Sequence, residues 1–323
     1  MKVFITGGSG FIGINLINSL EELGYSIVNY DILSPPIDAH KKYWFQGDIM
    51  DLKALKKKLS DFKPDWVIHL AARTDCDENT TVEDDYQLNT KGTANVLEAV
   101  GFVDSVRRLI ITSTQYVCGP GRQPKDDSDY FPHTVYGHSK VETEKLTRSA
   151  ELDTIWTIIR PVNIWGPHHQ RYSNEFWRIA SAGLYLHPDV SAPTRTYGYI
   201  GNVIWQMLTI LNSPEEKVNK QVFYVGDDPI QIDRWSIGFF KAFRGKDPIK
   251  VPMKAMKILG YIGDVISVVI RRPFFITSSR LNSMTEDYIS PVTKTKNLCG
   301  DAPYSLENGI EEVVNWYQKR KDK

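Results

Sequence analysis

Tyr136 and Lys140 stand four residues apart in the run Tyr136-Gly137-His138-Ser139-Lys140. On a helix this spacing places both side chains on one face. A nearby ammonium favours the phenolate, so it lowers the pKa of a tyrosine from its usual value of about 10. The pair therefore predicts a general base or acid. The hydroxyls of Thr112-Ser113-Thr114 end an apolar run upstream and can hold the substrate oxygen that Tyr136 deprotonates.

A glycine turn opens the chain, because the apolar run Val3–Ile5 is followed by glycines at the spacing G-x-x-G-x-x-G and then by a helical pattern. The first glycine lets the backbone turn, the second lets a pyrophosphate approach the amides, and the third lets helix and strand pack closely. The turn predicts a dinucleotide site, although its spacing differs from the commoner G-x-G-x-x-G. The residues expected there are Gly7, Gly10, Phe11, Ile12 and Gly13.

Asp31 lies about twenty residues after this turn, at the end of the second predicted strand. A carboxylate there accepts hydrogen bonds from the adenosine ribose hydroxyls and repels a 2′-phosphate. Its neighbours Tyr30, Ile32 and Leu33 include no cation. This pattern predicts NAD rather than NADP.

Two later segments are candidates for further cofactor contacts. Asp48 can accept a hydrogen bond from the adenine amino group while Ile49 lies on the ring, or it can cap the helix that begins near Asp51. In the run His69-Leu70-Ala71-Ala72-Arg73, small residues would let the nicotinamide half pass close to the backbone. We interpret His69 as a strand residue in the core rather than as a catalyst.

Composition excludes several functions. The 323 residues carry 39 Lys plus Arg and 39 Asp plus Glu, so no global field attracts nucleic acid or an acidic membrane. The three cysteines Cys76, Cys118 and Cys299 form no C-x-x-C pair, which argues against a disulfide framework or zinc site and fits a reducing cytosol. No signal peptide is readable, so we predict a cytoplasmic protein. No metal site is expected. The apolar stretch Ile258–Ile270 is too short to span a bilayer; we interpret it as a packed helix, with peripheral membrane contact as the alternative.

Short apolar strands alternate with helical patterns in the first half of the chain. This rhythm predicts an α/β fold of the Rossmann type, a doubly wound parallel sheet with a smaller C-terminal substrate-binding lobe. We place the NAD-binding domain at 1–166, with sheet elements contributed from later segments, and the interleaved lobe at 167–323, where only short, irregular elements are expected before a last helix. The predicted strands are Lys2–Thr6, Tyr25–Tyr30, Tyr43–Phe45, Trp66–Leu70, Arg108–Thr112 and Thr154–Ile159, and the predicted helices are Phe11–Leu23, Leu52–Ser60, Thr90–Val100, Tyr136–Ala150 and Leu306–Lys319.

With these motifs in place, the chain resembles the extended short-chain dehydrogenase/reductases of the NAD-dependent epimerase/dehydratase family, whose members mostly act on nucleotide sugars. The likeness covers nearly the whole chain. It implies that Tyr136 is the catalytic base, that Lys140 lowers its pKa and binds the nicotinamide ribose, and that Thr114 takes the catalytic Ser/Thr position. The matching segments are Thr6–Gly13, His69–Ala72, Asn89 with Lys91–Thr93, Tyr136–Lys140, Arg160–Pro167, Tyr199–Val203 and Tyr304–Ile310.

The same resemblance implies further contacts. Asn89 belongs to a cofactor-site motif, Pro161 nears the nicotinamide, and Asn163 nears substrate. Arg195, which precedes Thr196-Tyr197, aligns with an arginine that meets the substrate diphosphate, although a surface arginine is the alternative. Tyr197 is therefore expected in the substrate site. His168, His169 and Arg171 follow the Gly166-Pro167 turn and can line the same cleft. A homodimer through the helices around Thr90–Val100 and Tyr136–Ala150 is also implied.

Two positions depart from family patterns. Sugar-nucleotide 4,6-dehydratases carry an Asp-Glu pair where this chain has Gln115 and Tyr116, so that activity is disfavoured. Cys118 replaces a tyrosine, and we interpret it as a small packed thiol.

These observations leave three alternative functions. The first is an NAD-dependent epimerase or oxidoreductase acting on a nucleotide-activated sugar. The second is an NAD-dependent dehydrogenase of a non-nucleotide alcohol, sterol-like or small, with Ile258–Ile270 lining its pocket. The third is a non-catalytic NAD-binding regulator, which is disfavoured because Thr114, Tyr136 and Lys140 are all present.

Overall fold

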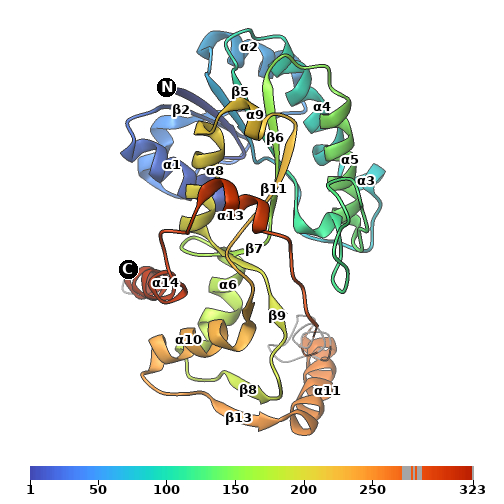
Figure 1. Cartoon of the computed structure of the whole chain (residues 1–323). Coiled ribbons are helices and arrows are strands. Elements are labelled where there is room, and N and C mark those ends of the chain that lie inside the picture. Colours follow the sequence, from blue (N-terminus) through green and yellow to red (C-terminus); the bar gives the residue numbers. More distant parts are fainter. Residues whose placement is uncertain (271–277, 279–280, 282–285, 322–323) are drawn as a thin grey trace.

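A seven-stranded parallel sheet forms the centre of the computed structural model, which describes residues 1–270, 278, 281 and 286–321 (Figure 1). Its order is β11-β6-β5-β4-β1-β2-β3, so the predicted doubly wound Rossmann sheet is confirmed. Each predicted strand is present, with ends displaced by at most two residues. The strands are β1 (Lys2–Thr6), β2 (Ser26–Asp31), β3 (Trp44–Gln46), β4 (Trp66–His69), β5 (Arg108–Thr112), β6 (Ile155–Pro161) and β11 (Gln221–Val225).

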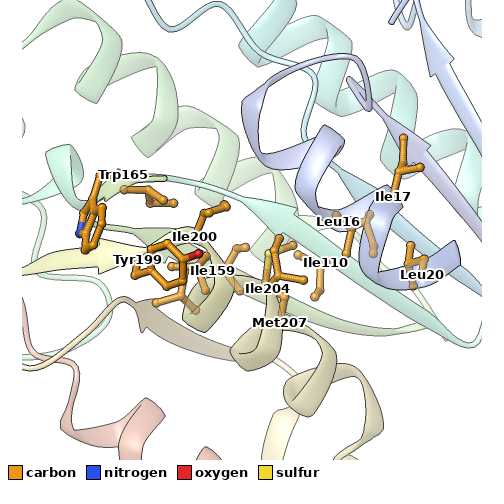
Figure 2. Packing of buried hydrophobic residues seen from close by; sticks show 14 of the residues in the cluster. Leu16, Ile17, Leu20, Ile110, Ile159, Trp165, Tyr199, Ile200, Ile204 and Met207 are labelled. Carbon is orange, nitrogen blue, oxygen red and sulfur yellow. The ribbon is translucent and has the colours of Figure 1, made fainter. Parts of the chain in front are cut away.

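Helices cover both faces of this sheet. On one face α1 (Phe11–Glu22) contacts α8 (Ile200–Asn212), and Figure 2 shows Leu16 and Ile17 of α1 in the same apolar layer as Ile204 and Met207 of α8. On the other face, α4 packs against both α2 and α5. The spacing of three or four residues between buried positions explains why each of these helices presents one apolar stripe to the strands. Their bounds are α2 (Leu52–Phe62), α4 (Gln87–Gly101) and α5 (Val135–Ser149).

A second group of elements lies beyond the carboxyl ends of the strands (Figure 1). Three two-stranded sheets form here, in which β7 pairs with β10, β9 with β12 and β8 with β13. The expectation of only short elements after 167 is wrong, because α8, α10 and α11 have 13, 13 and 18 residues. The elements are β7 (Asn163–Trp165), β8 (Leu186–Asp189), β9 (Thr194–Arg195), β10 (Tyr197–Tyr199), β12 (Ile230–Gln231), β13 (Ile249–Pro252), α10 (Ile232–Arg244), α11 (Met253–Ile270) and α14 (Leu306–Lys321).

The chain does not separate cleanly at 166, because α8 and β11 return from the later half to complete the sheet layer. The division into two domains stays a prediction. Within the described ranges, no helix is long and apolar enough to cross a membrane. The remaining short elements are η1 (Asp38–Tyr43), α3 (Val82–Asp85), η2 (Gln115–Val117), α6 (Gln170–Tyr172), η3 (Ser173–Trp177), α7 (Arg178–Ser181), α9 (Glu215–Val218) and α13 (Thr293–Cys299).

A buried ion pair fastens α5 to the sheet. The Glu144 carboxylate of α5 accepts hydrogen bonds from Nε and Nη2 of Arg160 on β6, at 2.8 and 2.7 Å. The hydroxyls of Ser113 and Tyr130 donate to the same carboxylate at 2.6 and 3.0 Å. Both charged side chains are fully buried. Such a pair is costly to break, because the remaining charge has no partner.

We therefore expect Glu144→Gln to lower the free energy of unfolding by about 3–5 kcal/mol, since it leaves the Arg160 charge buried and unpaired. The matched control is Glu142→Gln on the same helix, whose carboxylate pairs with Lys145 in the exposed region. That change should alter stability by less than about 1 kcal/mol. Denaturant unfolding at pH 7 measures both, and equal effects would contradict the assignment.

Candidate active site

Two cavities meet at the carboxyl ends of the parallel strands. The glycine cavity, of about 580 Å³, is bordered by the turn between β1 and α1. The aromatic cavity, of about 560 Å³, lies among the elements that follow β6. His169 and Arg171 line both cavities, so the two spaces adjoin. Of the three residues expected to line the substrate cleft, His169 and Arg171 border both cavities, whereas His168 borders the glycine cavity.

The glycine turn is held in place by contacts that exclude a side chain. Gly7 has a φ of +74°, and a Cβ there would lie 2.5 Å from the amide nitrogen of Ala71. A Cβ on Gly13 would lie 2.4 Å from the Cα of Gly8. Helix α1 begins after Gly10 with no side-chain cap, so its first amides are open to an anion. The predicted cofactor residues that line this cavity are Gly7, Gly10, Phe11, Ile12, Gly13, Asp31, Asp48, Ile49, Leu70, Ala71 and Ala72.

Local hydrogen bonds orient the two carboxylates of the glycine cavity. The Asp31 carboxylate accepts from the backbone amides of Ser9 and Leu33, at 3.0 and 2.9 Å, which holds it beside the glycine turn. The capping alternative for Asp48 is wrong, because Asp51 is the N-cap of α2 and accepts from Ala54 N at 3.0 Å. Asp48 instead borders the cavity.

Besides Tyr136 and Lys140, the predicted cofactor residues Arg73, Asn89 and Pro161 are not among the described residues that line either cavity. Asn89 is completely buried, accepts from the amide of Arg73 at 2.8 Å, and donates to the Ser139 hydroxyl at 2.9 Å. It therefore joins the loop after β4 to α5. Direct contact of these three residues with a cofactor stays a prediction.

His69 is a core residue, as interpreted from the sequence. It is buried on β4, with its Nδ1 2.7 Å from the Thr6 hydroxyl and its Nε2 3.1 Å from the Thr93 hydroxyl. Burial lowers its pKa to about 3, so it stays neutral.

Tyr136, Lys140 and Thr114 come together where β5 ends. The Thr134 hydroxyl accepts from Gly137 N at 2.9 Å and so starts α5 just before Tyr136. The ammonium of Lys140 donates to the Thr112 carbonyl at 2.8 Å, which joins α5 to the end of β5. Thr114 lines the aromatic cavity, whereas Tyr136 packs behind it at a ring-centroid distance of 6.2 Å from the cavity residue Tyr116.

The pKa of Tyr136 differs in direction from the expectation. Burial raises it, although the side-chain hydrogen bond with Thr114 acts in the opposite direction. The same burial lowers the pKa of Lys140 to about 8. Desolvation is the largest cause of the shift in both groups, and Tyr136 is held as a neutral phenol.

All four predicted substrate residues, Thr114, Asn163, Arg195 and Tyr197, line the aromatic cavity. Arg195 is also tied to the backbone, because its Nε donates to the Glu286 carbonyl at 3.1 Å. No sequence motif predicted the apolar and aromatic residues that form the rest of the cavity wall, although aromatic residues are frequent in the sequence after position 167. That wall includes Tyr116, Tyr172, Phe176, Tyr185, Trp235 and Met256.

The two departures from family patterns also have structural explanations. The Gln115 side chain is buried, and its Oε1 accepts from the Ser290 hydroxyl at 3.0 Å. Cys118 is buried and its pKa is raised by desolvation, which fits a packed thiol. The loop residue Cys76, which the sequence did not single out, lies close enough to Tyr136 for its thiolate to raise the phenol pKa.

The family model described as NAD dependent epimerase/dehydratase family matches residues 3–226. The chain belongs to this family. It is 24% identical over 327 residues to N-acetyl-alpha-D-glucosaminyl-diphospho-ditrans,octacis-undecaprenol 4-epimerase of Escherichia coli O157:H7, covering 98% of this chain and 95% of that protein. It is also 24% identical over 344 residues to the decarboxylating sterol-4-alpha-carboxylate 3-dehydrogenase of Candida albicans, covering 98% and 97%.

Solved structures share the fold. The UDP-glucose 4-epimerase of Thermotoga maritima, determined with UDP-glucose, superposes with a TM-score of 0.74. The match is 22% identical and covers 99% of this chain and 100% of that one. Together with family membership, the glycine cradle, the open N-terminus of α1 and the Asp31 carboxylate fit NAD as the cofactor. In the described ranges, no group of three or more His, Cys, Asp or Glu residues is placed to hold a metal ion.

The lowered pKa of Lys140 makes NAD binding depend on pH if its ammonium donates to the ribose, as we propose. Below pH 8 most of the lysine is an ammonium, and above it the neutral amine donates only weaker hydrogen bonds without charge. We expect the Kd for NAD to rise about tenfold between pH 7 and pH 9, because binding would require one proton that is lost with a pKa of about 8. Fluorescence titration measures this. Lys140→Met should bind NAD weakly, with the same Kd at pH 7 and pH 9. The matched control Lys145→Met should bind NAD as the wild type does. A wild-type Kd that does not change with pH would refute the proposed role of Lys140 in NAD binding.

Proposed function

We propose that the protein is an NAD-dependent C4 epimerase of a sugar activated through a diphosphate, with a nucleotide as the first carrier to test. The observation that carries this proposal is the junction of the two cavities at His169 and Arg171. Thr114 borders the same aromatic cavity, with Tyr136 close behind it. A cofactor along the glycine turn and a sugar in the aromatic cavity would meet at these hydroxyls.

Each residue then has a chemical task. Thr114 would hold the oxygen of the sugar hydroxyl at C4, and the phenol oxygen of Tyr136 would remove and return the proton of that hydroxyl. Bound NAD supplies the site with reversible hydride transfer at this carbon. The ammonium of Lys140 stabilises the phenolate whenever it forms. Arg171 and Arg195 are suited to hold the diphosphate, because a guanidinium forms two parallel hydrogen bonds to the oxygens of one phosphate group.

A 4,6-dehydratase is disfavoured by two side chains. Water elimination needs carboxylic acids beside Thr114, where this chain has Gln115 and Tyr116. The amide of Gln115 cannot donate a proton at neutral pH, and it faces Ser290. Burial raises the pKa of Tyr116, so its phenol is not an acid of comparable strength.

A second candidate is the NAD-dependent oxidation of an apolar alcohol. The walls of the aromatic cavity favour it, because Ile164, Phe176, Ile179, Trp235 and Met256 would contact an apolar ring system. The full-length likeness to a sterol dehydrogenase supports the same possibility.

The presence of Thr114, Tyr136 and Lys140 supports catalysis over a purely regulatory NAD-binding role. A homodimer through α4 and α5 and a cytoplasmic location remain proposals that accompany the epimerase assignment.

Tyr136→Phe should reduce kcat by about 10²–10⁴-fold, the range expected for loss of a general acid or base, while leaving NAD affinity within about twofold. The assay follows interconversion of the C4 epimers of a UDP-sugar by proton NMR. Tyr304→Phe, which removes a hydroxyl from a more exposed tyrosine, is the matched control and should retain full turnover. An active Tyr136→Phe enzyme would exclude this mechanism.

The two candidate substrates are separated by thermal stability. If the aromatic cavity takes a diphosphate, uridine diphosphate or inorganic pyrophosphate should raise the Tm of the NAD complex by a few degrees, because ligands that bind only the folded state stabilise it. Arg171→Ala should lose this shift, whereas Arg178→Ala, outside the described cavity lining, should keep it. Stabilisation by a 3-hydroxysterol, with no response to any diphosphate, would favour the alcohol dehydrogenase instead.

A further inference from the structure

One face of α11 is apolar and exposed to solvent. Ile258, Tyr261, Ile262 and Val265, the α11 stripe, have exposed fractions between 50% and 67%. Their spacing of three, four and seven residues places them along one side of the helix. A soluble helix ordinarily turns such a stripe toward the core. Figure 1 shows α11 at the edge of the molecule farthest from the central sheet. A contiguous apolar surface of this kind marks an interaction site.

The first turn of the same helix borders the aromatic cavity on the side opposite the stripe. Met256 is 2% exposed and lines that cavity. Gly260 lies one turn further along, where an added Cβ would be 2.8 Å from Leu281, a second cavity residue. The interpretation of Ile258–Ile270 as a packed helix therefore holds for the inner face but not for the α11 stripe. The expectation that Ile258–Ile270 lines the pocket is wrong, because none of its described residues borders the cavity. The cavity reaches α11 at Met256, and the α11 stripe continues from there along the outer side of the helix.

The edge of the cavity next to α11 is apolar as well. Val190 lines the cavity yet is 41% exposed. It follows Asp189, whose register partner on β13 is Pro252, the residue immediately before α11. An apolar ligand chain leaving the cavity at this edge would therefore pass beside the start of the helix.

Positive charges accompany the α11 stripe. Lys254 and Lys257 are exposed and lie one helical turn before Ile258 and Tyr261 respectively, while Lys250 is exposed on β13. The one acidic residue between Met253 and Ser267 is Asp264, which is turned toward the inner side, where it accepts from Ser278 N at 3.1 Å. Lysines beside an apolar helical stripe match a bilayer surface, where anionic headgroups lie above acyl chains.

We propose that the α11 stripe docks the protein on an anionic lipid surface, so that the aromatic cavity receives a substrate whose carrier is a lipid. The proposal deepens the function proposed above and rests on it for the chemistry of the substrate: the sugar diphosphate would be linked to a lipid rather than to a nucleoside. The sugar and diphosphate occupy the part of the cavity near Thr114 and Arg171, and the lipid chain leaves past Val190 and α11 toward the bilayer.

Sedimentation with vesicles tests the docking in the full-length protein with NAD. Vesicles of phosphatidylglycerol and phosphatidylcholine at about 3:7 should bind wild type, and binding should weaken as salt rises because the lysines contribute. Ile258→Asp combined with Val265→Asp should reduce binding at least about tenfold, since two charges would enter the apolar layer. Leu23→Asp, which changes an exposed leucine at the end of α1, is the matched control and should bind as wild type.

Absence of wild-type binding to these vesicles, or unchanged binding of the double variant, overturns the proposal. A wild type that ignores vesicles but changes from dimer to monomer with the double variant shows that a second copy covers the stripe, and this also overturns it. Epimerisation of a polyprenyl-diphosphate sugar in the same vesicles should fall in the double variant, while turnover of a soluble UDP-sugar stays unchanged. Stripe-dependent vesicle binding without any sugar turnover refutes the epimerase and leaves the docking standing.

Discussion

The buried pair of Glu144 and Arg160 is the interaction on which the geometry of the candidate active site depends. It connects α5, which carries Tyr136 and Lys140, to β6, and through Ser113 it also reaches the end of β5. Helix packing alone would allow α5 to slide by a fraction of a turn, because apolar contacts are not directional. Charge-assisted hydrogen bonds with fixed angles remove that freedom. The relative positions of Tyr136 and Thr114 are therefore set deep inside the protein, away from the cavity that Thr114 lines.

Burial also determines the chemistry of this site. The enclosed phenol of Tyr136 has a raised pKa and the enclosed ammonium of Lys140 a lowered one. At pH 7 the phenol is therefore neutral while most of the lysine still carries its charge. In the proposed mechanism, proton transfer between substrate and phenol would develop charge in a region with little water. Ligands that bring compensating charge or hydrogen bonds would change this balance, so the proposed catalysis would depend on both cavities being filled.

Much of the fold was predictable, because it follows from local patterns. The glycine turn and the alternation of apolar strands with helical periods define a parallel sheet, and the carboxyl ends of such strands meet at one edge, which is why Thr114 and Tyr136 could be placed together. The pKa of Tyr136 could not be predicted, since spacing reveals the ammonium but not the depth of burial. The wall of the aromatic cavity around β8 was also hidden, because it depends on β8 pairing with β13 across some sixty residues. For α11, both faces of the helix are apolar, so periodicity alone could not tell which face is packed.

Because the two cavities share residues, binding of a ligand in one cavity can change the affinity of the other cavity for its ligand. Arg171 borders the glycine cavity and the aromatic cavity at once, so a ligand in either space acts on the same guanidinium. If one ligand orders or neutralises this side chain, the affinity for the other must change, and linkage requires the change to be equal in both directions. The coupling between the two ligands would then depend on one side chain at the boundary between the cavities.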